Sequence, residues 1–298
     1  MSVLVTGADG FVGKYVCQAV DGLELIDEAG AIDIRERTRI RDFLADRLPE
    51  QVIHLAAQSH VPASFEDPET TFAINFHGTF NLLSALQECG FRGRFLYISS
   101  GDIYGRVTED QLPITEEMPA RPRNPYAVSK VAAEALCYQF SQTGGFECVI
   151  ARPFNHIGAG QSDHFAVSDF SRQIVSIKRH AKPLVLKAGD VDVTRDFLDV
   201  RDVVSAYLLI LEKGINGECY NVCSGRETRI RDIITLISQE CGLEMSIEQD
   251  LSRFRPSEQR RMCGDNSRLV KQTGWKQKYS LQESVASVVE YWEKQDND

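Results

Sequence analysis

The sequence has no apolar run close to the roughly 18 residues that a membrane-spanning helix needs. A secretory leader is not expected either, because residues 6–13 interrupt the first apolar stretch too early. The eight cysteines never occur in the paired Cys-x-x-Cys spacing of zinc and redox sites. These absences predict a cytoplasmic protein that has no membrane partner and no metal site.

Positive charge is also scarce. The 33 lysines and arginines stand against 43 aspartates and glutamates, which gives a formal net charge of −10. A nucleic-acid backbone would be repelled on average, so an anionic partner needs local clusters of arginine or lysine. Repeats and low-complexity tracts are missing, and 298 residues with 43% hydrophobic content can bury a large core. The composition predicts a soluble enzyme built as one large domain, or as a domain with a lobe.

The amino terminus carries a glycine-rich turn between an apolar strand and a helix. Residues 2–6 run into Gly7-Ala-Asp-Gly10-Phe-Val-Gly13, and an apolar-periodic segment follows to about Val20. Glycines let a pyrophosphate approach the backbone, and the free amides and dipole of a helix start attract its charge. The spacing differs from the usual fingerprint and is also compatible with a plain tight turn. The position directly after the first strand favours a dinucleotide site.

A second pattern joins Tyr126 to Lys130 in the segment Tyr-Ala-Val-Ser-Lys. Positions four apart share one face of a helix, so the phenol and the ammonium project together. A cation that lowers the phenol pKa by about three units supplies roughly 4 kcal/mol towards the phenolate. Ser100 follows the apolar run 95–98 and would bond the same substrate oxygen. The Tyr–Lys spacing alone is compatible with a surface pair, but together these residues predict a proton-transfer site.

Strands and helices alternate along the first half of the chain. Strands are expected at 2–6, 23–26, 51–55, 94–99 and 147–152. Helices are expected at 39–48, 70–89 and 125–143, after a first helix that follows the glycine turn and runs to about Val20. Strands joined through helices predict an α/β fold with a doubly wound parallel sheet of the Rossmann type. Asn124 and Pro125 suit the cap and first position of the last helix.

The regular alternation of strands and helices ends after residue 153, and loops are expected at 155–166 and 189–196. We therefore expect a dinucleotide-binding domain at 1–153, to which segments at about 185–220 return. Residues 154–298 would mainly form a smaller, partly discontinuous α/β substrate lobe. Its expected helices are 167–179, 201–212, 230–241 and 281–292.

Five further motifs complete the pattern: Arg152-Pro-Phe-Asn155-His-Ile-Gly-Ala-Gly-Gln161, Ser168-Asp-Phe-Ser-Arg-Gln-Ile174, Arg195-Asp-Phe-Leu-Asp-Val-Arg-Asp202, Tyr220-Asn-Val-Cys-Ser-Gly225 and Arg255-Pro-Ser-Glu258. With them the chain resembles an extended short-chain dehydrogenase/reductase, the family that modifies nucleotide sugars, from residue 3 to about 292. It is most similar to the branch of GDP-4-dehydro-6-deoxy-D-mannose reductases. That likeness implies a role in GDP-D-rhamnose and polysaccharide biosynthesis.

The resemblance also implies which residues bind. Cofactor contacts would come from Gly7, Gly10, Phe11, Val12 and Gly13 at the pyrophosphate, Asp33 and Ile34 at the adenine, Leu55, Ala56 and Ala57 at the adenosine ribose and pyrophosphate, and Tyr126 and Lys130 at the nicotinamide ribose. Substrate contacts would come from Gln58, Ser59, Ser100, Asn155, Lys187, Arg195, Arg255, Pro256, Ser257 and Glu258. Two guanidinium groups, Arg195 and Arg255, suit a diphosphate. Surface ion pairs remain an alternative for these two arginines, a strand end for Lys187, and loop hydrogen bonds for Gln58, Ser59 and Asn155.

The implied reaction reduces the 4-keto group of a GDP-linked 4-keto-6-deoxy sugar. Hydride would come from the nicotinamide and the proton from Tyr126, while Ser100 stabilises the developing alkoxide and Lys130 fixes the ribose. The alternatives are a GDP-mannose 4,6-dehydratase or a nucleotide-sugar 4-epimerase, in which Asp102 would help remove water or be structural. An inert dinucleotide-binding scaffold is disfavoured by the complete catalytic set.

Cofactor choice and assembly are the remaining expectations. The resemblance favours NADPH, with NADH possible. Asp27 at the ribose hydroxyls would favour NADH, whereas Arg35 or Arg37 at a 2′-phosphate would favour NADPH. The helices at 70–89 and 125–143 would pair with their copies in a homodimer through a four-helix bundle.

Overall fold

The structure, a computed structural model, describes residues 2–20, 22–180, 183–250 and 259–295. Its centre is a six-stranded sheet in the order β11-β7-β6-β5-β1-β2. All of its strand pairs are parallel. The strands are β1 (Val3–Thr6), β2 (Gly22–Glu24), β5 (Gln51–His54), β6 (Arg94–Ile98), β7 (Glu147–Pro153) and β11 (Cys219–Val222). The predicted doubly wound parallel sheet is confirmed.

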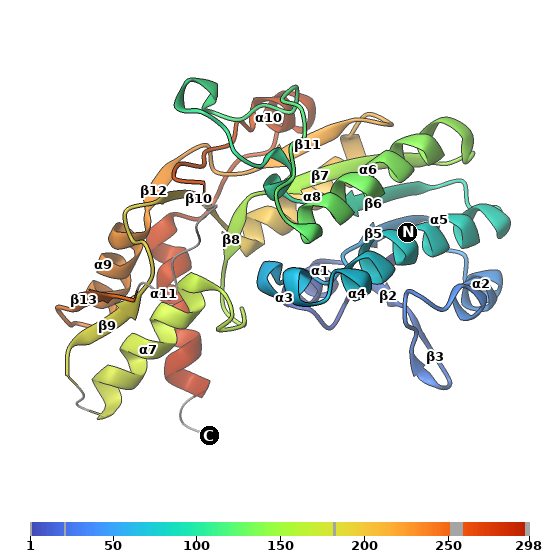
Figure 1. The fold of residues 1–298 in the computed structure, drawn as a ribbon. Helices are drawn as coiled ribbons and strands as arrows, with labels where there is room; N and C mark the ends of the chain where they lie inside the picture. Colours follow the sequence, from blue (N-terminus) through green and yellow to red (C-terminus); the bar gives the residue numbers. More distant parts are fainter. Residues whose placement is uncertain (1, 21, 181–182, 251–258, 296–298) are drawn as a thin grey trace.

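Helices cover both faces of this sheet (Figure 1). On one face lie α2 (Arg37–Asp46), α5 (Thr79–Glu88) and α6 (Pro125–Thr143), which pack on Leu4 of β1. On the other lie α1 (Phe11–Ala19) and α8 (Val200–Lys213), which form one apolar cluster with Val3 and Val5. Because successive residues of a strand point to opposite faces, the continuous apolar run of β1 suits a sheet buried on both sides.

The strand order reverses beside β1, because β2 lies on one side of β1 and β5 on the other. Ligands of open α/β sheets bind outside the carboxyl ends of the strands at such a point. A small hairpin, β3 (Ile26–Asp27) with β4 (Gly30–Ala31), follows β2 directly. The hairpin accounts for the short segment between the first helix and α2.

A second lobe lies beyond the carboxyl edge of the sheet (Figure 1). Its strands are β8 (Asn155–Ile157), β10 (Thr194–Asp199) and β12 (Glu227–Arg229) in one sheet, and β9 (Val185–Ala188) with β13 (Ser246–Gln249) in another. Around one apolar cluster pack α7 (Ala166–His180), α9 (Ile230–Glu240) and α11 (Leu281–Gln295). The segment α10 (Ser267–Thr273) contacts α8 and β11 instead.

Three expectations about local structure need correction. The helix expected at 201–212 in the lobe is α8, which contacts α1, β6 and β7 of the central layer. The returning segment is thus 200–222, whereas β9 pairs with β13 in the lobe. The loops expected at 155–166 and 189–196 contain β8 and the start of β10, because these short strands pair with each other rather than with a sequence neighbour.

The single helix expected at 70–89 is divided. It consists of α4 (Pro68–Phe72), a π-helical segment (Ala73–Gly78) and α5, and it follows the short α3 (Val61–Glu66). The buried Asn75 lies in the π-helical part, where its side chain accepts from Gln58 N at 2.8 Å and donates to Gln58 O at 3.0 Å and Ser129 Oγ at 2.9 Å. The wider turn thus places an amide that ties the loop after β5 to α6.

The start of α6 is as predicted. Asn124 accepts a hydrogen bond from Ala127 N at 2.7 Å, and Pro125 occupies the first turn. Short 3₁₀ segments at Gly101–Tyr104 and Glu109–Gln111 precede it. Among the described residues, no helix has the length and apolar character to cross a membrane.

Candidate active site

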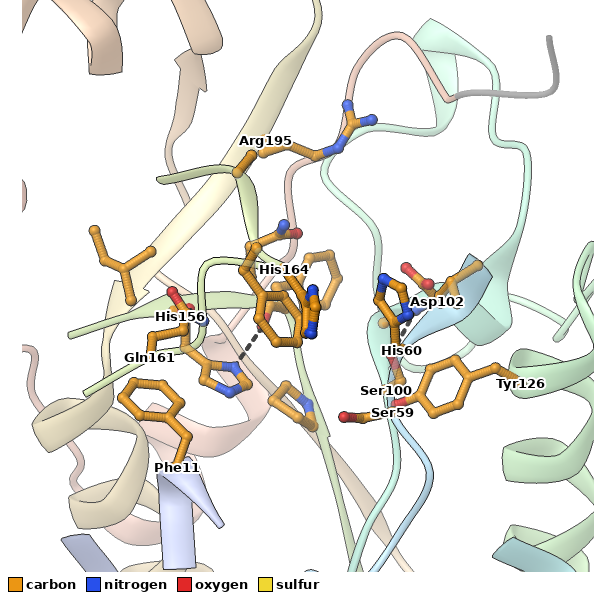
Figure 2. Close-up of a pocket in the computed structure, with 18 of the residues that line it drawn as sticks. Phe11, Ser59, His60, Ser100, Asp102, Tyr126, His156, Gln161, His164 and Arg195 are labelled. Carbon is orange, nitrogen blue, oxygen red and sulfur yellow. Dashed lines mark hydrogen bonds between the residues drawn. The ribbon is translucent and has the colours of Figure 1, made fainter. Parts of the chain in front are cut away.

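A large cavity lies between the carboxyl ends of the central strands and the second lobe. Figure 2 shows Ser100, Asp102 and Tyr126 on one side of it, and Phe11, His156 and Gln161 on the other. The predicted residues that line it are Gly7, Gly10, Phe11, Val12, Gly13, Leu55, Ala56, Ala57, Ser59, Ser100, Tyr126, Lys130, Asn155 and Arg195. The fold therefore brings both ends of the predicted site into one space.

The glycine loop forms one end of the cavity and leaves no room for larger residues. Gly7 has a φ of 70°, and a Cβ there would lie 2.9 Å from Ala56 N. A Cβ on Gly13 would lie 2.1 Å from Gly7 O. Gly10 caps α1 without a side-chain hydrogen bond, and the first turn of α1 has no acidic residue. Backbone amides and the positive end of the helix dipole thus face the cavity, which fits a dinucleotide pyrophosphate.

Ser100, Tyr126 and Lys130 meet at the inner end. Ser100 follows β6 and accepts a hydrogen bond from Asp102 N at 3.1 Å. Tyr126 stands in the first turn of α6, and Lys130 lies one turn later; both side chains are buried. Lys130 Nζ donates to Ile98 O at 2.8 Å and lies 5.8 Å from the Tyr126 ring centre. The three groups form one cluster at the end of β6.

The pKa values in this cluster differ from the sequence-based expectation. Burial raises the pKa of Tyr126, and the charge of Asp102 raises it further, while a hydrogen bond with Ser100 lowers it. Burial lowers the pKa of Lys130 to about 8, against the opposing effects of Cys137 and Glu134. The expected depression of the phenol pKa by the ammonium is therefore wrong for this structure, because burial disfavours the phenolate and raises the pKa. Tyr126 holds its proton at neutral pH, as a proton donor must.

Other predicted residues lie outside the cavity lining. Asp33 forms an ion pair with Arg35, Ile34 packs against Gly78, and Gln58 is hydrogen-bonded to Asn75. Lys187 is an exposed residue of β9. Arg255, Pro256, Ser257 and Glu258 lie outside the described residues.

Arg195 reaches the cavity from β10 in the second lobe, above the other labelled side chains in Figure 2. Its Nη1 donates to the carbonyl oxygens of Thr194 at 2.7 Å and Gln259 at 2.8 Å. These bonds orient the guanidinium, whose planar donors suit a phosphate. A cation on the lobe thus faces the central layer across the cavity.

The groups expected to select the cofactor are engaged in ion pairs. Asp27 accepts two hydrogen bonds from Arg39, at 2.7 and 2.9 Å. Arg37 pairs with Glu88. The guanidinium of Arg35, paired with Asp33, would have to exchange partners to bind a 2′-phosphate.

Sequence reasoning missed several residues that line the cavity. His60 and His164 extend from opposite sides and bring their ring centres within 5.3 Å. His156 stacks on Phe11 at 6.1 Å with an interplanar angle of 5°, and Gln161 Nε2 donates to His156 O. His156 and Gln161 belong to the sequence motif at 152–161. This motif follows the end of a predicted strand, and that position was the signal that could have identified them as cavity residues. His60 directly follows Ser59, whereas nothing marked His164.

This fold and these side chains define an extended short-chain dehydrogenase/reductase, a class of NAD(P)-dependent oxidoreductases. A family model described as GDP-mannose 4,6 dehydratase matches residues 28–288, and the chain belongs to that family. The chain is 48% identical to the GDP-6-deoxy-D-mannose reductase of Pseudomonas aeruginosa over 98% of this chain and 97% of the relative.

Solved structures agree with this assignment. One is described as RMD from Pseudomonas aeruginosa complexed with NADPH; its TM-score is 0.93, with 46% identity and 99% of each chain covered. Another is the UDP-glucose 4-epimerase of Thermus thermophilus in complex with NAD, with a TM-score of 0.86, 28% identity and coverage of 98% of this chain and 99% of that one.

Proposed function

We propose that the chain reduces the 4-keto group of GDP-4-dehydro-6-deoxy-D-mannose to give GDP-D-rhamnose. The observation that carries this proposal is the cluster of Ser100, Tyr126 and Lys130 at the inner end of a cavity whose other end is the glycine loop. The 48% identity to a GDP-6-deoxy-D-mannose reductase supports the choice of sugar.

The cofactor is a reduced nicotinamide dinucleotide, NADPH in preference to NADH. When bound, it supplies the hydride that the carbonyl carbon receives. Support comes from the similar structure complexed with NADPH, while the similar epimerase structure contains NAD. The loop residues Gly7, Gly10, Phe11, Val12 and Gly13 would hold the pyrophosphate, Leu55 to Ala57 the adenosine side, and Asp33 and Ile34 the adenine.

The chain's own groups handle the proton. Tyr126 donates its phenolic proton to the sugar oxygen, which becomes a hydroxyl, and Ser100 donates a hydrogen bond to the same oxygen. Lys130, largely protonated at neutral pH with a pKa of about 8, stabilises the phenolate that Tyr126 leaves behind. Its bond to Ile98 O keeps the ammonium in place.

The second lobe would bind the nucleotide sugar. Ser59 and Asn155 line the cavity between the glycine loop and the lobe, and Arg195 offers a cation to the diphosphate. The proposed substrate site also includes Gln58, Lys187, Arg255, Pro256, Ser257 and Glu258. The GDP-linked 4-keto sugar is thus held between two layers of the protein.

A dehydratase is the second candidate, because Asp102 lines the cavity and its charge acts on Tyr126. An acid beside the proton donor suits the removal of water, but Gly101 precedes it, so no acidic pair is present. Purified protein with NADPH and GDP-4-dehydro-6-deoxy-D-mannose separates the candidates. A reductase consumes the reduced cofactor stoichiometrically and yields GDP-D-rhamnose by mass and NMR. A dehydratase or epimerase leaves the amount of reduced cofactor unchanged, and an inert scaffold yields no product.

We further propose a cytoplasmic homodimer formed through α5 and α6. The exposed apolar side chains Phe80, Val128 and Tyr138 lie on these helices. Eight free cysteines suit a reducing compartment.

A further inference from the structure

Two hydroxyl groups on the cavity wall have no hydrogen-bond partner among the described residues. They belong to Tyr207 on α8 and to Ser99 at the end of β6, and both residues line the cavity. Their exposed fractions are 0% and 2%, and within the part of the chain that the structure describes neither hydroxyl oxygen has a partner. A buried hydroxyl without a partner destabilises a fold, so two on one cavity wall point to a ligand.

Both hydroxyls belong to the inner end of the cavity. The backbone N–H of Ser99 donates to Ala151 O at 2.8 Å, which places Ser99 beside the end of β7. Tyr207 packs in the same apolar cluster as Ala151 and Ile98. Tyr207 and Tyr126 line the same cavity. Burial raises the pKa of Tyr207, and an electrostatic interaction with Tyr126 raises it further.

Tyr207 belongs to the opposite face of the sheet from the proton donor's helix, and Ser99 lies at the end of the strand between them. Tyr126 and Lys130 come from α6 on one face, whereas Tyr207 comes from α8 on the other. In the proposed reaction the sugar oxygen is bound by Ser100, which follows β6, and by Tyr126 of α6. The Tyr207 and Ser99 hydroxyls are therefore available to a different polar group at the same end.

A primary carboxamide has the matching chemistry. Its carbonyl oxygen accepts and its amide nitrogen donates, while a hydroxyl group does either. Two buried hydroxyls on one cavity wall therefore suit one carboxamide without a charge, in a buried place where a charge would be costly.

We propose that Tyr207 and Ser99 bind the carboxamide of the nicotinamide ring. This inference rests on the proposed function only in requiring a nicotinamide cofactor, and it does not depend on the identity of the sugar. The two bonds would restrain the rotation of the ring beside the oxygen that Ser100 and Tyr126 are proposed to bind.

Equilibrium binding tests this without turnover. Dissociation constants of the full chain are measured for NADPH, for its 3-acetylpyridine analogue, whose acetyl group lacks the amide nitrogen, and for 2′,5′-ADP, which lacks the nicotinamide. We expect Tyr207→Phe and Ser99→Ala each to weaken NADPH binding about 5- to 10-fold, the effect of one lost hydrogen bond. Binding of 2′,5′-ADP stays unchanged, and the double variant loses the preference for NADPH over the analogue.

Tyr97→Phe is the matched control. Tyr97 is also a buried tyrosine whose hydroxyl lacks a partner among the described residues, but it does not line the cavity. It should leave all three dissociation constants unchanged. Thermal unfolding without ligand should be no lower for Tyr207→Phe than for the natural chain, since the substitution removes an unpaired hydroxyl.

Two results would overturn the inference. One is NADPH binding by Tyr207→Phe equal to that of the natural chain, as expected if the hydroxyls hold only water. The other is an equal loss for NADPH and 2′,5′-ADP, which would indicate a general distortion. Failure of the sugar to be reduced while NADPH binding responds as expected would instead contradict the proposed function alone.

Discussion

Tyr126 shows how a single residue acquires its role from its surroundings. Burial opposes a phenolate, so the proton stays on Tyr126 until a substrate oxygen accepts it. The neighbouring Ser100 bonds the phenol and faces the same cavity. Proton donation and oxyanion stabilisation are thus assigned to separate side chains, and each can be removed on its own.

We expect Tyr126→Phe to lower kcat by about 10²- to 10⁴-fold, because the ring stays and only the transferable proton is lost. The dissociation constant for NADPH should stay near that of the natural chain. Steady-state kinetics with the keto sugar and a fluorescence titration with NADPH measure the two quantities. A variant that keeps most of its turnover would exclude Tyr126 as the donor.

Ser100→Ala should raise the activation barrier by about 2 to 4 kcal/mol, the usual effect of removing one oxyanion donor. The loss should appear in kcat more than in KM, since the bond strengthens as charge develops on the oxygen. Comparing the two constants for variant and natural chain checks this. A change in kcat close to zero would make Ser100 a bystander.

Lys130 should cost stability at neutral pH. Its folded pKa of about 8 lies below the ordinary 10.5, so between these values the unfolded chain binds more protons and the free energy of unfolding rises with pH. We expect Lys130→Met to be more stable than the natural chain at pH 7 by up to about 3 kcal/mol, although inactive. Urea unfolding from pH 7 to 10.5 should show the difference shrinking. An unchanged pH slope in the variant would contradict this account.

At the scale of elements, α6 is fixed to the sheet by a polar contact as well as by its apolar face. Arg152 of β7 donates to both carboxylate oxygens of Glu134, at 3.0 and 2.7 Å, and to Tyr104 OH at 2.9 Å. The pair is largely buried, and it connects the helix of Tyr126 to the 3₁₀ segment that follows Ser100. The register between the two catalytic elements depends on it.

Breaking this pair from one side should be costly. We expect Arg152→Met to lower the free energy of unfolding by about 3 to 5 kcal/mol, because Glu134 would be left buried and unpaired. The double variant Arg152→Met with Glu134→Leu should recover much of that loss. Urea denaturation of both single variants and the double variant gives the coupling energy. Additive losses would show that the two side chains do not act as a pair.

Elements whose signals are local could be predicted, and those that depend on distant contacts could not. Asn124 and Pro125 predict the start of α6, and the glycine loop predicts a strand, a turn and a helix. The apolar stripe of α8 indicates a buried face but not the sheet against which it packs. The π-helical turn depends on the partners that Asn75 finds 17 and 54 residues away.

The candidate site likewise contains residues that local spacing predicts and features that depend on the whole fold. Ser100, Tyr126 and Lys130 were predicted from spacing, because neighbours on a helix face or at a strand end are close by construction. The predicted direction of the Tyr126 pKa shift was wrong, because the burial of a side chain depends on the whole fold. Tyr207 occupies an apolar position of a helix, so the sequence does not mark it as a binding residue. Its hydroxyl is identified as a candidate binding group only because the residue lines the cavity.

At the scale of the whole molecule, the outer face of α5 and α6 is the proposed dimer interface. Val128 and Tyr138 are 40% and 56% exposed there. We expect Val128→Glu combined with Tyr138→Glu to convert a dimer into a monomer, since buried unpaired charge opposes association. Light scattering after size-exclusion chromatography measures the mass. The matched control is Val270→Glu, because Val270 is 41% exposed but lies on α10. A natural chain that is already monomeric would contradict the proposed interface.

The late return of α8 and β11 to the central sheet decides how this polypeptide tolerates truncation. A fragment ending at residue 153 would contain five of the six strands but would expose the side of β6 and β7 that α8 covers. Such a fragment should not fold autonomously, even though its sequence reads as a self-contained nucleotide-binding module. Swapping specificity with a relative therefore requires grafting discontinuous stretches, not a single cut and join.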